Sequence, residues 1–494
     1  MTTPVATHRI TGALERAGLL AGVRGALPAA FGAVADDSRA VTPGALFVAV
    51  RGSTRDGHDF LESAAAAGAG AVIVEDASRT TLPAIVVRNG RRAAALAAAA
   101  FWDEPARGMR LVAVTGTNGK TTTVAMLRHL LDAPEARGAS IGTLGVLVGS
   151  AGEAIDGGGG LTTPGPVELQ RVLRLLADAG VRTVAMEVSS HSLDQRRVEG
   201  LAFDAAVFTN LTRDHLDYHG TMESYFAAKA GLVSYLTGDG AVVANSDDPA
   251  WRALPSSPRR VTFGTAHMAD VRAEQVTFAP RGSAWRLVTP RGGADVHLPL
   301  IGDFNVVNAV GAAAAAYALG LDATAIAARL STMPQVPGRL EMVGERPTVL
   351  RDYAHTPDAL ERALKSLRPF AAGELIVVFG AGGDRDRGKR PLMGATARAH
   401  ADRLIVTSDN PRSEDPERII DDIVAPLPAG SYDRIEDRRA AIAHAIALAD
   451  PARDVVLLAG KGHETYQIRG ADTLHFDERE IVADLLADRE GAGA

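Results

Sequence analysis

Short apolar runs and helical stretches alternate along most of the chain. Apolar runs at residues 45–50, 71–75 and 84–87 predict strands, and the alanine-rich stretch 91–102 predicts a helix. The alternation resumes with a strand-like run at 110–114 that precedes a helical pattern, and it returns in the last third of the chain. Alternation of this kind predicts parallel sheets covered by helices, with ligands at the carboxyl ends of the strands.

Two breaks divide this pattern. The polar segment 103–108 and the turn 335–339, which contains Pro and Gly, indicate domain boundaries. Between them, 261–300 alternates with period two and predicts a hairpin excursion, whereas the glycine-rich segment 151–160 predicts a flexible surface loop. At about 150 residues per domain, a chain of 494 residues is expected to form three domains. We predict three α/β domains, at 1–108, 109–336 and 337–494.

Composition excludes several classes of protein. Hydrophobic residues make up 46% of the chain and charged residues 22%, the balance of a globular protein. A net charge of -7 argues against a nucleic-acid partner, which would need a basic face. The apolar run 309–321 is shorter than the roughly 20 residues that span a bilayer, and the N-terminus lacks the apolar region of a secretory signal. With no cysteine, we expect a soluble, cytoplasmic monomer without membrane insertion, disulfides or thiolate chemistry.

Lysine is scarce among the basic residues. A chain that uses arginine for most surface cations is expected to keep lysine where a compact amine is required. Lys365 lies in an amphipathic helical pattern and is expected on a solvated face, whereas the others lie in or beside motifs. Of the 52 basic residues only five are lysine: Lys120, Lys229, Lys365, Lys389 and Lys461.

The segment TGTNGKTT, at 115–122, lies between a strand-like run and a helical pattern. Glycines allow the backbone N–H groups to converge on a phosphate at the start of a helix. Lys120 is expected to reach the β- and γ-phosphates, and a threonine hydroxyl to hold Mg²⁺. The strict pattern has a glycine where this chain has Val114, and a plain strand–turn–helix is the alternative. The predicted ATP-binding residues here are Gly116, Thr117, Asn118, Gly119, Lys120, Thr121 and Thr122.

The form TGTNGKTTT, without the first glycine, resembles the ATP-dependent Mur ligase family, which also includes folylpolyglutamate synthases. Further matching motifs extend over nearly the whole chain. They are DDSR at 36–39, FVAVRG at 47–52, TTP at 162–164, EVSSH at 187–191, NLTRDHLDYHG at 210–220, Phe304-Asn305 with Asn308, GR at 338–339 and DYAH at 352–355. The resemblance implies an N-terminal uridine-nucleotide-binding α/β domain, a central P-loop-type ATPase domain with a parallel sheet, and a C-terminal Rossmann-like domain.

The resemblance also implies an activity. It implies a ligase that activates a carboxylate as an acyl phosphate and adds meso-2,6-diaminopimelate to UDP-N-acetylmuramoyl-L-alanyl-D-glutamate, in cytoplasmic peptidoglycan precursor synthesis. Mg²⁺ and cations stabilise phosphoryl transfer, and the resemblance implies ATP as a substrate and two Mg²⁺ ions.

Three alternatives remain. L-lysine or a modified diaminopimelate could be the amino acid, or the chain could be a folylpolyglutamate synthase, against which the N-terminal motifs speak. The third alternative is a non-catalytic nucleotide switch or motor ATPase. A ligase should release phosphate only when both other substrates are present, whereas a switch would need neither.

Several residues are candidates for metal binding. Glu187 ends the strand-like run 181–188, where its carboxylate can face the phosphate loop, although a capping role is the alternative. His215 lies in a polar loop after another strand-like run. The resemblance implies that both bind Mg²⁺, with Thr121. Lys229, otherwise a solvated helical lysine, matches a carbamylated lysine of the family, and a carbamate offers two oxygens to Mg²⁺. The predicted catalytic residues are Lys120, His215 and Lys229.

Other site residues follow from the resemblance alone. Asn308, which by itself would be an ordinary helix residue, is implied to contact adenine, while Arg339 and Asp352 are implied to contact the rest of the nucleotide. The residues implied to bind the UDP-sugar peptide are Ser38, Ser53, Thr54, Arg55, Thr162, Thr163, Ser189, Gln195 and Arg197.

Three strand-like runs of the last third end in polar loops, at 382–385, 409–412 and 460–464. Such loops converge at one edge of a parallel sheet. An Asp, a Glu and two Arg suit a ligand that carries both an ammonium and a carboxylate at its distal centre, which L-lysine does not. The DNPR sequence resembles the diaminopimelate signature of the family, a simple turn being the alternative. The implied amino-acid-binding residues are Arg385, Asp409, Asn410, Pro411, Arg412, Gly460 and Glu464.

Overall fold

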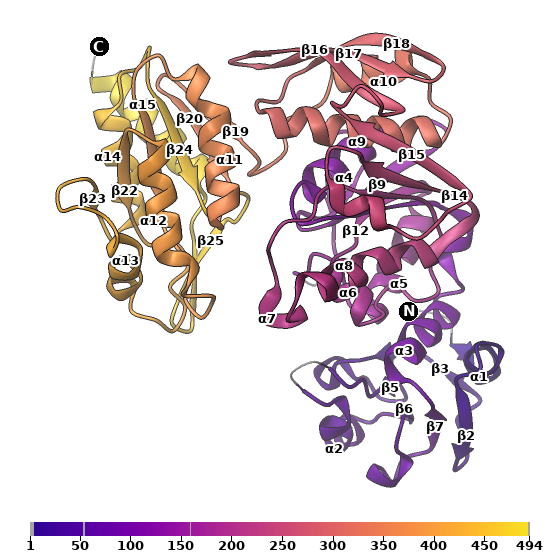
Figure 1. Ribbon diagram of the computed structural model, residues 1–494. Coiled ribbons are helices and arrows are strands. Elements are labelled where there is room, and N and C mark those ends of the chain that lie inside the picture. The colour runs from indigo at the N-terminus through magenta and orange to yellow at the C-terminus, as the bar shows by residue number, and fades with distance from the viewer. Residues whose placement is uncertain (1–3, 53–54, 159, 493–494) are drawn as a thin grey trace. The chain divides into compact units, whose positions relative to one another are not determined.

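The structure is a computed structural model that describes residues 4–52, 55–158 and 160–492. Packing divides the chain into two compact units. The first contains the residues up to 272 with 288–292 and 309–326, and the second contains 273–287, 293–308 and the residues from 327 onward. Figure 1 shows both units as mixed α/β structures.

The first unit begins with a five-stranded sheet of order β2-β7-β6-β5-β4. Strands β4 to β7 are parallel, and β2 is antiparallel at one edge. Apolar residues of α1 and α3 cover one face, and those of α2 cover the other. The predicted strands and helix of this region are confirmed. The bounds are α1 Thr7–Arg16, β2 Leu20–Arg24, β4 Val34–Ala35, β5 Leu46–Val48, α2 Leu61–Ala66, β6 Ala71–Val74, β7 Ala84–Val87 and α3 Gly90–Phe101.

A second sheet of the first unit carries the phosphate loop. Its order from the edge is β11-β10-β9-β12-β8-β13-β14-β15, parallel from β9 to β15. Apolar side chains of β8, β12, β13 and α5 form a buried core. Because β12, β8 and β13 are parallel neighbours, the loops that follow them meet at one edge. The bounds are β8 Arg110–Thr115, α4 Lys120–Leu131, β9 Arg137–Gly142, β10 Gly145–Val148, α5 Pro166–Asp178, β12 Val181–Glu187, β13 Phe203–Phe208, β14 Leu236–Asn245 and β15 Arg259–Gly264.

The prediction of a flexible loop over 151–160 is wrong at its centre. Residues Glu153–Ile155 form strand β11, which pairs antiparallel with β10. Ile155 packs against the core of this sheet, and Glu153 accepts a hydrogen bond from Arg137. The glycine-rich composition concealed this short edge strand, because the glycines supply the turns on either side of it.

The hairpin excursion predicted at 261–300 is confirmed. Strands β16 (Val271–Ala279), β17 (Gly282–Thr289) and β18 (Gly292–Leu298) are successive hydrogen-bonded neighbours joined by two-residue turns. The apolar run 309–321 falls mostly within helix α9 (Asp303–Ala318), and α10 (Ala323–Leu330) comes after it.

The third sheet lies in the second unit and has the order β19-β20-β24-β21-β22-β23. It is parallel except for the edge strand β19. Helices α11, α12 and α13 cover one face and α14 and α15 cover the other (Figure 1). Apolar side chains of both groups of helices pack on the sheet. This is the doubly wound arrangement that was predicted. The bounds are β19 Glu341–Glu345, β20 Thr348–Asp352, α11 Pro357–Leu367, β21 Leu375–Phe379, α12 Lys389–His400, β22 Arg403–Val406, α13 Pro416–Val424, β23 Asp433–Arg434, α14 Arg438–Leu448, β24 Val455–Ala459 and α15 Glu478–Ala492.

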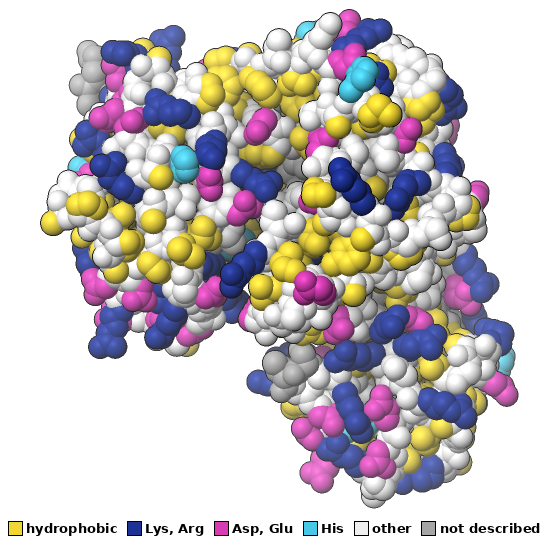
Figure 2. Space-filling view, in the orientation of Figure 1, with side chains coloured by type: hydrophobic (Ala, Val, Ile, Leu, Met, Phe, Trp, Pro, Cys, Tyr) yellow, Lys and Arg dark blue, Asp and Glu magenta, His cyan; other side chains and the backbone are white. Residues whose placement is uncertain are grey.

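The three sheets agree with three α/β domains, and the boundaries after residues 108 and 336 stay predictions. In the part of the chain that the structure describes, no helix is both long and apolar enough to cross a membrane. Figure 2 shows basic and acidic side chains interspersed over the face in view.

Candidate active site

The phosphate loop joins β8 to α4 and depends on two glycines. Gly116 and Gly119 have φ angles of 149° and 84°, which side-chain-bearing residues rarely adopt. A Cβ atom on Gly116 would lie 1.9 Å from the hydroxyl oxygen of Thr209. The loop therefore requires glycine at 116 both for its backbone angles and for the close approach of the next strand's loop.

The residues that follow β13 hold this loop in place. The backbone N–H of Thr117 donates to the carbonyl oxygen of Asn210 at 2.7 Å, and that of Asn118 donates to Asn210 Oδ1 at 2.9 Å. The hydroxyl of Thr209 donates to the carbonyl of Asn118 at 2.7 Å. Sequence analysis did not assign a role to Thr209 or Asn210. The sequence feature that could have indicated this role is the polar pair that they form at the end of a strand next to the phosphate-loop strand.

Two lysine amines converge on the loop. Lys120 Nζ donates to the carbonyl oxygens of Gly116 and Thr117 at 2.9 and 2.8 Å, and Lys229 Nζ donates to that of Gly116 at 2.8 Å. Lys229 extends from α8 (Met222–Ala230), and its amine lies 4.5 Å from the centre of the Tyr225 ring. It is 1% exposed, so the alternative of a solvated helical lysine is wrong. Burial, with Lys120 nearby, lowers the pKa of Lys229 well below its usual value.

The proposed metal ligands lie on three different elements. Glu187 ends β12, is 1% exposed, and accepts a hydrogen bond from the backbone N–H of Thr143 at 2.8 Å. His215 precedes α7 (Leu216–His219) with a φ angle of 54°. Thr121 is buried in the first turn of α4. Among the described residues no three His, Asp or Glu side chains form a metal-binding group. Mg²⁺ is commonly held by one or two carboxylates together with substrate phosphates, so this donor set fits a site completed by a nucleotide.

A histidine cluster lines a cavity beside these residues. The ring of His191, in α6 (Ser190–Asp194), lies 4.7 Å from that of His215 and 4.2 Å from that of Tyr218, between ring centres. Burial, followed by the charges of His215 and His219, lowers the pKa of His191 to about 4. The cavity has a volume of about 820 Å³ and is lined by His191, Asp194, Asp217, Tyr218, His219, Ser224, Ala227 and Ala228.

The structure brings together five of the residues expected to bind the UDP-sugar peptide. The buried hydroxyl of Thr163 donates to the carbonyl of Glu187 at 2.9 Å and accepts from the N–H of Ser189 at 3.1 Å. The guanidinium of Arg197 donates to the Thr163 carbonyl at 2.8 Å and to Gln195 Oε1 at 2.7 Å. Gln195 then donates to the hydroxyl of the cavity residue Tyr218, and the hydroxyl of Thr162 lies 3.4 Å from that of Thr143.

Two further residues expected to bind the UDP-sugar peptide, Ser38 and Arg55, lie outside the strands of the N-terminal sheet. Ser38 begins a short 3-10 helix, and Arg55 is exposed in a tight turn in which Gly52 N–H donates to its carbonyl at 2.8 Å. Ser53 and Thr54 lie outside the described residues.

Three residues expected to contact the nucleotide lie in the second unit. Asn308 is 6% exposed in α9 and lies 3.4 Å from Asn305 Oδ1. The Arg339 guanidinium stacks 4.7 Å from the centre of the Tyr353 ring. Asp352, at the end of β20, accepts from the N–H of Leu340 at 2.7 Å, and burial raises its pKa to about 6 although Arg339 opposes the shift. Arg339 and Asp352 are therefore brought together.

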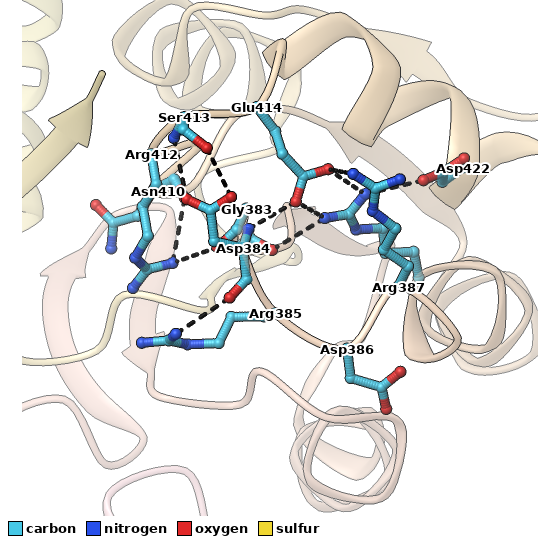
Figure 3. Close-up of polar contacts among 12 residues, drawn as sticks. Gly383, Asp384, Arg385, Asp386, Arg387, Asn410, Arg412, Ser413, Glu414 and Asp422 are labelled. Atoms are coloured by element: carbon cyan, nitrogen blue, oxygen red, sulfur yellow. Dashed lines mark hydrogen bonds and ion pairs between the residues drawn. The ribbon is translucent and has the colours of Figure 1, made fainter. Parts of the chain in front are cut away.

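The three polar loops of the C-terminal sheet follow its neighbouring strands β21, β22 and β24, as expected. Arg412 has a φ angle of 53°, and its guanidinium donates to the carbonyl of Gly383 at 2.9 Å (Figure 3). Pro411 is buried, and Arg385 is exposed. A Cβ atom on Gly460 would lie 2.5 Å from Asp409 Oδ2. The DNPR sequence is thus more than a simple turn, because it packs against both other loops.

A set of ion pairs fixes the first two loops to each other (Figure 3). The hydroxyl of Ser413 donates to Asp384 Oδ1 at 2.7 Å. Glu414 accepts from the buried guanidinium of Arg390 at 2.8 Å and from the N–H of Asp384 at 2.6 Å. The hydrogen bonds from Arg390 hold the pKa of Glu414 down, to about 2. These contacts between the two loops were not predicted, since the spacing of residues in the sequence does not indicate which charges pair across two loops.

Lys461, for which no role was predicted, lies among the residues expected to bind the amino acid. Asn410 Nδ2 donates to Glu464 Oε2 at 2.7 Å. The amine of Lys461 lies 3.2 Å from Asn410 Oδ1, 3.5 Å from Glu464 Oε2 and 3.8 Å from Asp409 Oδ1. The two carboxylates expected to bind an ammonium ion therefore already have an internal cation beside them. The scarcity of lysine was the signal that pointed to it.

These features define an ATP-binding α/β protein with a second polar site on its C-terminal sheet. Three models of the Mur ligase family match the chain: the catalytic domain at 32–102, the middle domain at 114–316 and the glutamate ligase domain at 338–462. The chain belongs to the Mur ligase family.

Known relatives extend over the whole fold. The UDP-N-acetylmuramoyl-L-alanyl-D-glutamate–2,6-diaminopimelate ligase of Synechococcus elongatus is 47% identical over 484 residues, which covers 94% of this chain and 96% of the relative. A solved structure of a ligase of the same name is 32% identical with a TM-score of 0.67, covering 99% of this chain and 100% of that one. The MurF ligase of Thermotoga maritima in complex with ADP, at 20% identity and a TM-score of 0.63, covers 93% of this chain and 98% of that one and shares the fold.

Proposed function

We propose that the chain is an ATP-dependent ligase that adds meso-2,6-diaminopimelate to UDP-N-acetylmuramoyl-L-alanyl-D-glutamate in peptidoglycan precursor synthesis. The observation that carries the proposal is the second buried amine, Lys229, beside the phosphate loop. A nucleotide switch needs the phosphate-loop lysine but has no use for another amine buried there. The names of relatives at 42–47% identity agree with this reaction.

The reaction has two balanced steps. An oxygen of the D-glutamyl carboxylate attacks the γ-phosphorus of ATP, the bond to ADP breaks, and an acyl phosphate forms. The amine nitrogen of diaminopimelate then attacks the acyl carbon, and phosphate leaves with the attacking carboxylate oxygen while the amine loses a proton. Lys120, at the start of α4, would stabilise charge on the transferred phosphoryl group.

Magnesium is part of this proposal. Thr121, Glu187, His215 and a carbamylated Lys229 would hold two ions together with the phosphates, and the ions would neutralise phosphate charge. Mg²⁺ prefers oxygen ligands, so Lys229 contributes only after modification supplies carbamate oxygens. Its lowered pKa supports the modification, because the neutral amine is the form that attacks carbon dioxide. The product is a carbamate and a released proton.

Each substrate has its own set of residues in this proposal. Gly116 to Thr122 would bind the ATP phosphates, and Asn308, Arg339 and Asp352 the rest of the nucleotide. Ser38, Arg55 and the group of Thr162, Thr163, Ser189, Gln195 and Arg197 would bind the UDP-sugar peptide, with Ser53 and Thr54. The loops that carry Arg385, Asp409 to Arg412, Gly460 and Glu464 would bind the amino acid. The cytoplasmic location and the monomeric state remain predictions.

The closest alternative functions differ in the amino acid that the ligase would add. Arg412 offers a planar guanidinium in the loop that also carries Asp409, and a guanidinium binds a carboxylate through two parallel hydrogen bonds. Meso-diaminopimelate has a distal carboxylate for it, and L-lysine has none. This arrangement favours diaminopimelate.

An isotope experiment tests the acyl phosphate directly. The D-glutamyl carboxylate is labelled with heavy oxygen, and the phosphate released during ligation is examined by mass spectrometry. One labelled oxygen should appear in each phosphate. Unlabelled phosphate, or phosphate release without either co-substrate, would mean that ATP is hydrolysed by water and that the ligase proposal is wrong.

A further inference from the structure

Lys461 is a fully buried lysine to which the proposed reaction assigns no role. Its side chain is 0% exposed, in the loop that follows β24. By contrast Lys365 is 58% exposed on α11, where it pairs with Glu361 as a surface lysine does. Burying an ammonium is costly unless its neighbours compensate, so the neighbours of Lys461 indicate its purpose.

Those neighbours are three of the residues proposed to bind the amino acid. The amine is within 3.2 to 3.8 Å of Asn410, Glu464 and Asp409. The rings of Tyr466 and Phe476 lie 5.8 and 5.7 Å away and cover it. The amine thus lies behind the polar atoms that would face a ligand and touches the ligand only through them.

We propose that Lys461 is a positioning residue that determines which amino acid is used: it cancels one of the two carboxylate charges of Asp409 and Glu464, so that the pocket prefers a zwitterionic distal centre to a lone ammonium. This inference rests on the proposed function, which places the amino acid at these loops.

The charges around the amine support this assignment. One positive group and two negative groups leave a single negative charge, whether the proton lies on Lys461 or on Glu464. The next charges inward, Arg438 and Glu478, pair at 2.7 Å with both side chains 0% exposed and cancel each other. Arg412 then brings the sum over these four groups, Lys461, Asp409, Glu464 and Arg412, to zero, which matches the neutral ammonium–carboxylate pair of diaminopimelate. The exposed Arg385 lies outside this sum.

Without Lys461 the net charge of the pocket changes. Two carboxylates and one arginine leave a negative pocket, which attracts the cationic side chain of L-lysine. A unit charge one layer of side chains away from the ligand, at the effective dielectric constant of protein sites, alters relative binding by roughly 10- to 100-fold.

The test compares Lys461→Met with wild type, using kcat/KM for meso-diaminopimelate divided by kcat/KM for L-lysine. The ratio should fall roughly 10- to 100-fold. A merely structural lysine would lower both constants together and leave the ratio unchanged, which would overturn the proposal. Lys365→Met, which removes an exposed lysine that also pairs with a glutamate, is the matched control and should keep the wild-type ratio.

A measurement on wild type decides the question if Lys461→Met does not fold. L-Lysine carries the distal ammonium without the carboxylate, and 2-aminopimelate carries the carboxylate without the ammonium. A neutral pocket predicts inhibition constants for these two within about tenfold of each other, both weaker than diaminopimelate. An inhibition constant for lysine far below that for 2-aminopimelate would show a negative pocket and overturn the proposal. If wild type ligates no diaminopimelate, the proposed function itself fails, which is a separate outcome.

Discussion

The amines of Lys120 and Lys229 share one hydrogen-bond acceptor, the carbonyl oxygen of Gly116, at 2.9 and 2.8 Å. Two ammonium ions this close repel each other, and the charge of Lys120 adds to burial in lowering the pKa of Lys229. The arrangement therefore favours the neutral, reactive form of the Lys229 amine, while Lys120 is the amine proposed to bind phosphate. This division of roles underlies the first two predictions.

Lys120→Ala should abolish ligation while leaving the affinity for the UDP-sugar peptide nearly unchanged. Removing a cation that stabilises the transferred phosphoryl group is expected to lower kcat by about 10²- to 10³-fold, as removal of an oxyanion donor does. Steady-state kinetics and calorimetric binding of the UDP-sugar peptide measure the two effects. Near-wild-type turnover would contradict the phosphate-loop assignment.

Lys229 should carry a carbamate when bicarbonate is present. Carbon-13 NMR of the protein in labelled bicarbonate should show one carbamate signal that Lys229→Ala lacks, and that variant should be nearly inactive. Lys365→Ala is the control, because an exposed lysine contributes within about 0.5 kcal/mol to most properties. If Lys229→Ala is active and its carbon-13 spectrum matches that of wild type, the modification is refuted.

Gly116→Ala should displace the phosphate loop. A Cβ atom there would lie 1.9 Å from Thr209 Oγ1, and the φ angle of 149° is unfavourable for alanine. We expect ATP affinity to fall at least about tenfold, which corresponds to about 1.4 kcal/mol. Gly108→Ala, whose Cβ would meet nothing within 4 Å, is the matched control and should bind ATP as wild type does. Equal ATP affinity in both variants would show that the loop tolerates the methyl group.

His191 should make the folded state less stable in acid. Its pKa is lowered from 6.5 to about 4, so between these values the unfolded chain binds a proton that the folded protein does not. Stability from this group is complete above about pH 6.5 and is lost as the pH falls toward about 4. In His191→Gln the melting temperature should fall less steeply across this window than in wild type, whereas His8→Gln, at an exposed position in α1, should keep the wild-type slope. Parallel slopes for all three proteins would contradict a neutral, buried His191.

Arg412→Ala should lose activity with diaminopimelate while ATP affinity stays nearly unchanged. Removing one member of a buried charge pair costs about 2–5 kcal/mol, or roughly 30- to several-thousand-fold in kcat/KM. The variant need not gain activity with lysine, since accepting a ligand demands contacts of its own. Steady-state kinetics with both amino acids provide the measurement. An unchanged kcat/KM for diaminopimelate would rule out the proposed contact between Arg412 and the distal carboxylate.

Periodicity and loop chemistry predicted much of this molecule. The strand–glycine–helix pattern at 110–131 and the three polar loops of the last sheet were predicted because both follow from backbone geometry. Edge strand β11 was missed because its three residues are too few to show a period. The pairing of Asp384 with Ser413 could not be predicted, since it depends on how two loops meet after folding.

The sequence also did not reveal which charged side chains are buried. Lys229 and Lys461 were marked by the scarcity of lysine, but composition cannot show that both amines are buried or what lies beside them. For Lys461 the neighbours turned out to be the same carboxylates that were expected to bind the ligand.

Amino-acid-dependent ligation is the most direct test of the central claim. The purified protein is incubated with ATP, Mg²⁺ and UDP-N-acetylmuramoyl-L-alanyl-D-glutamate, and phosphate release and the peptide product are followed with meso-diaminopimelate, with L-lysine and with no amino acid. The account predicts one phosphate per tripeptide with meso-diaminopimelate, and little of either product in the other two reactions. Equal phosphate release in all three, or ligation of lysine in preference to diaminopimelate, would contradict it.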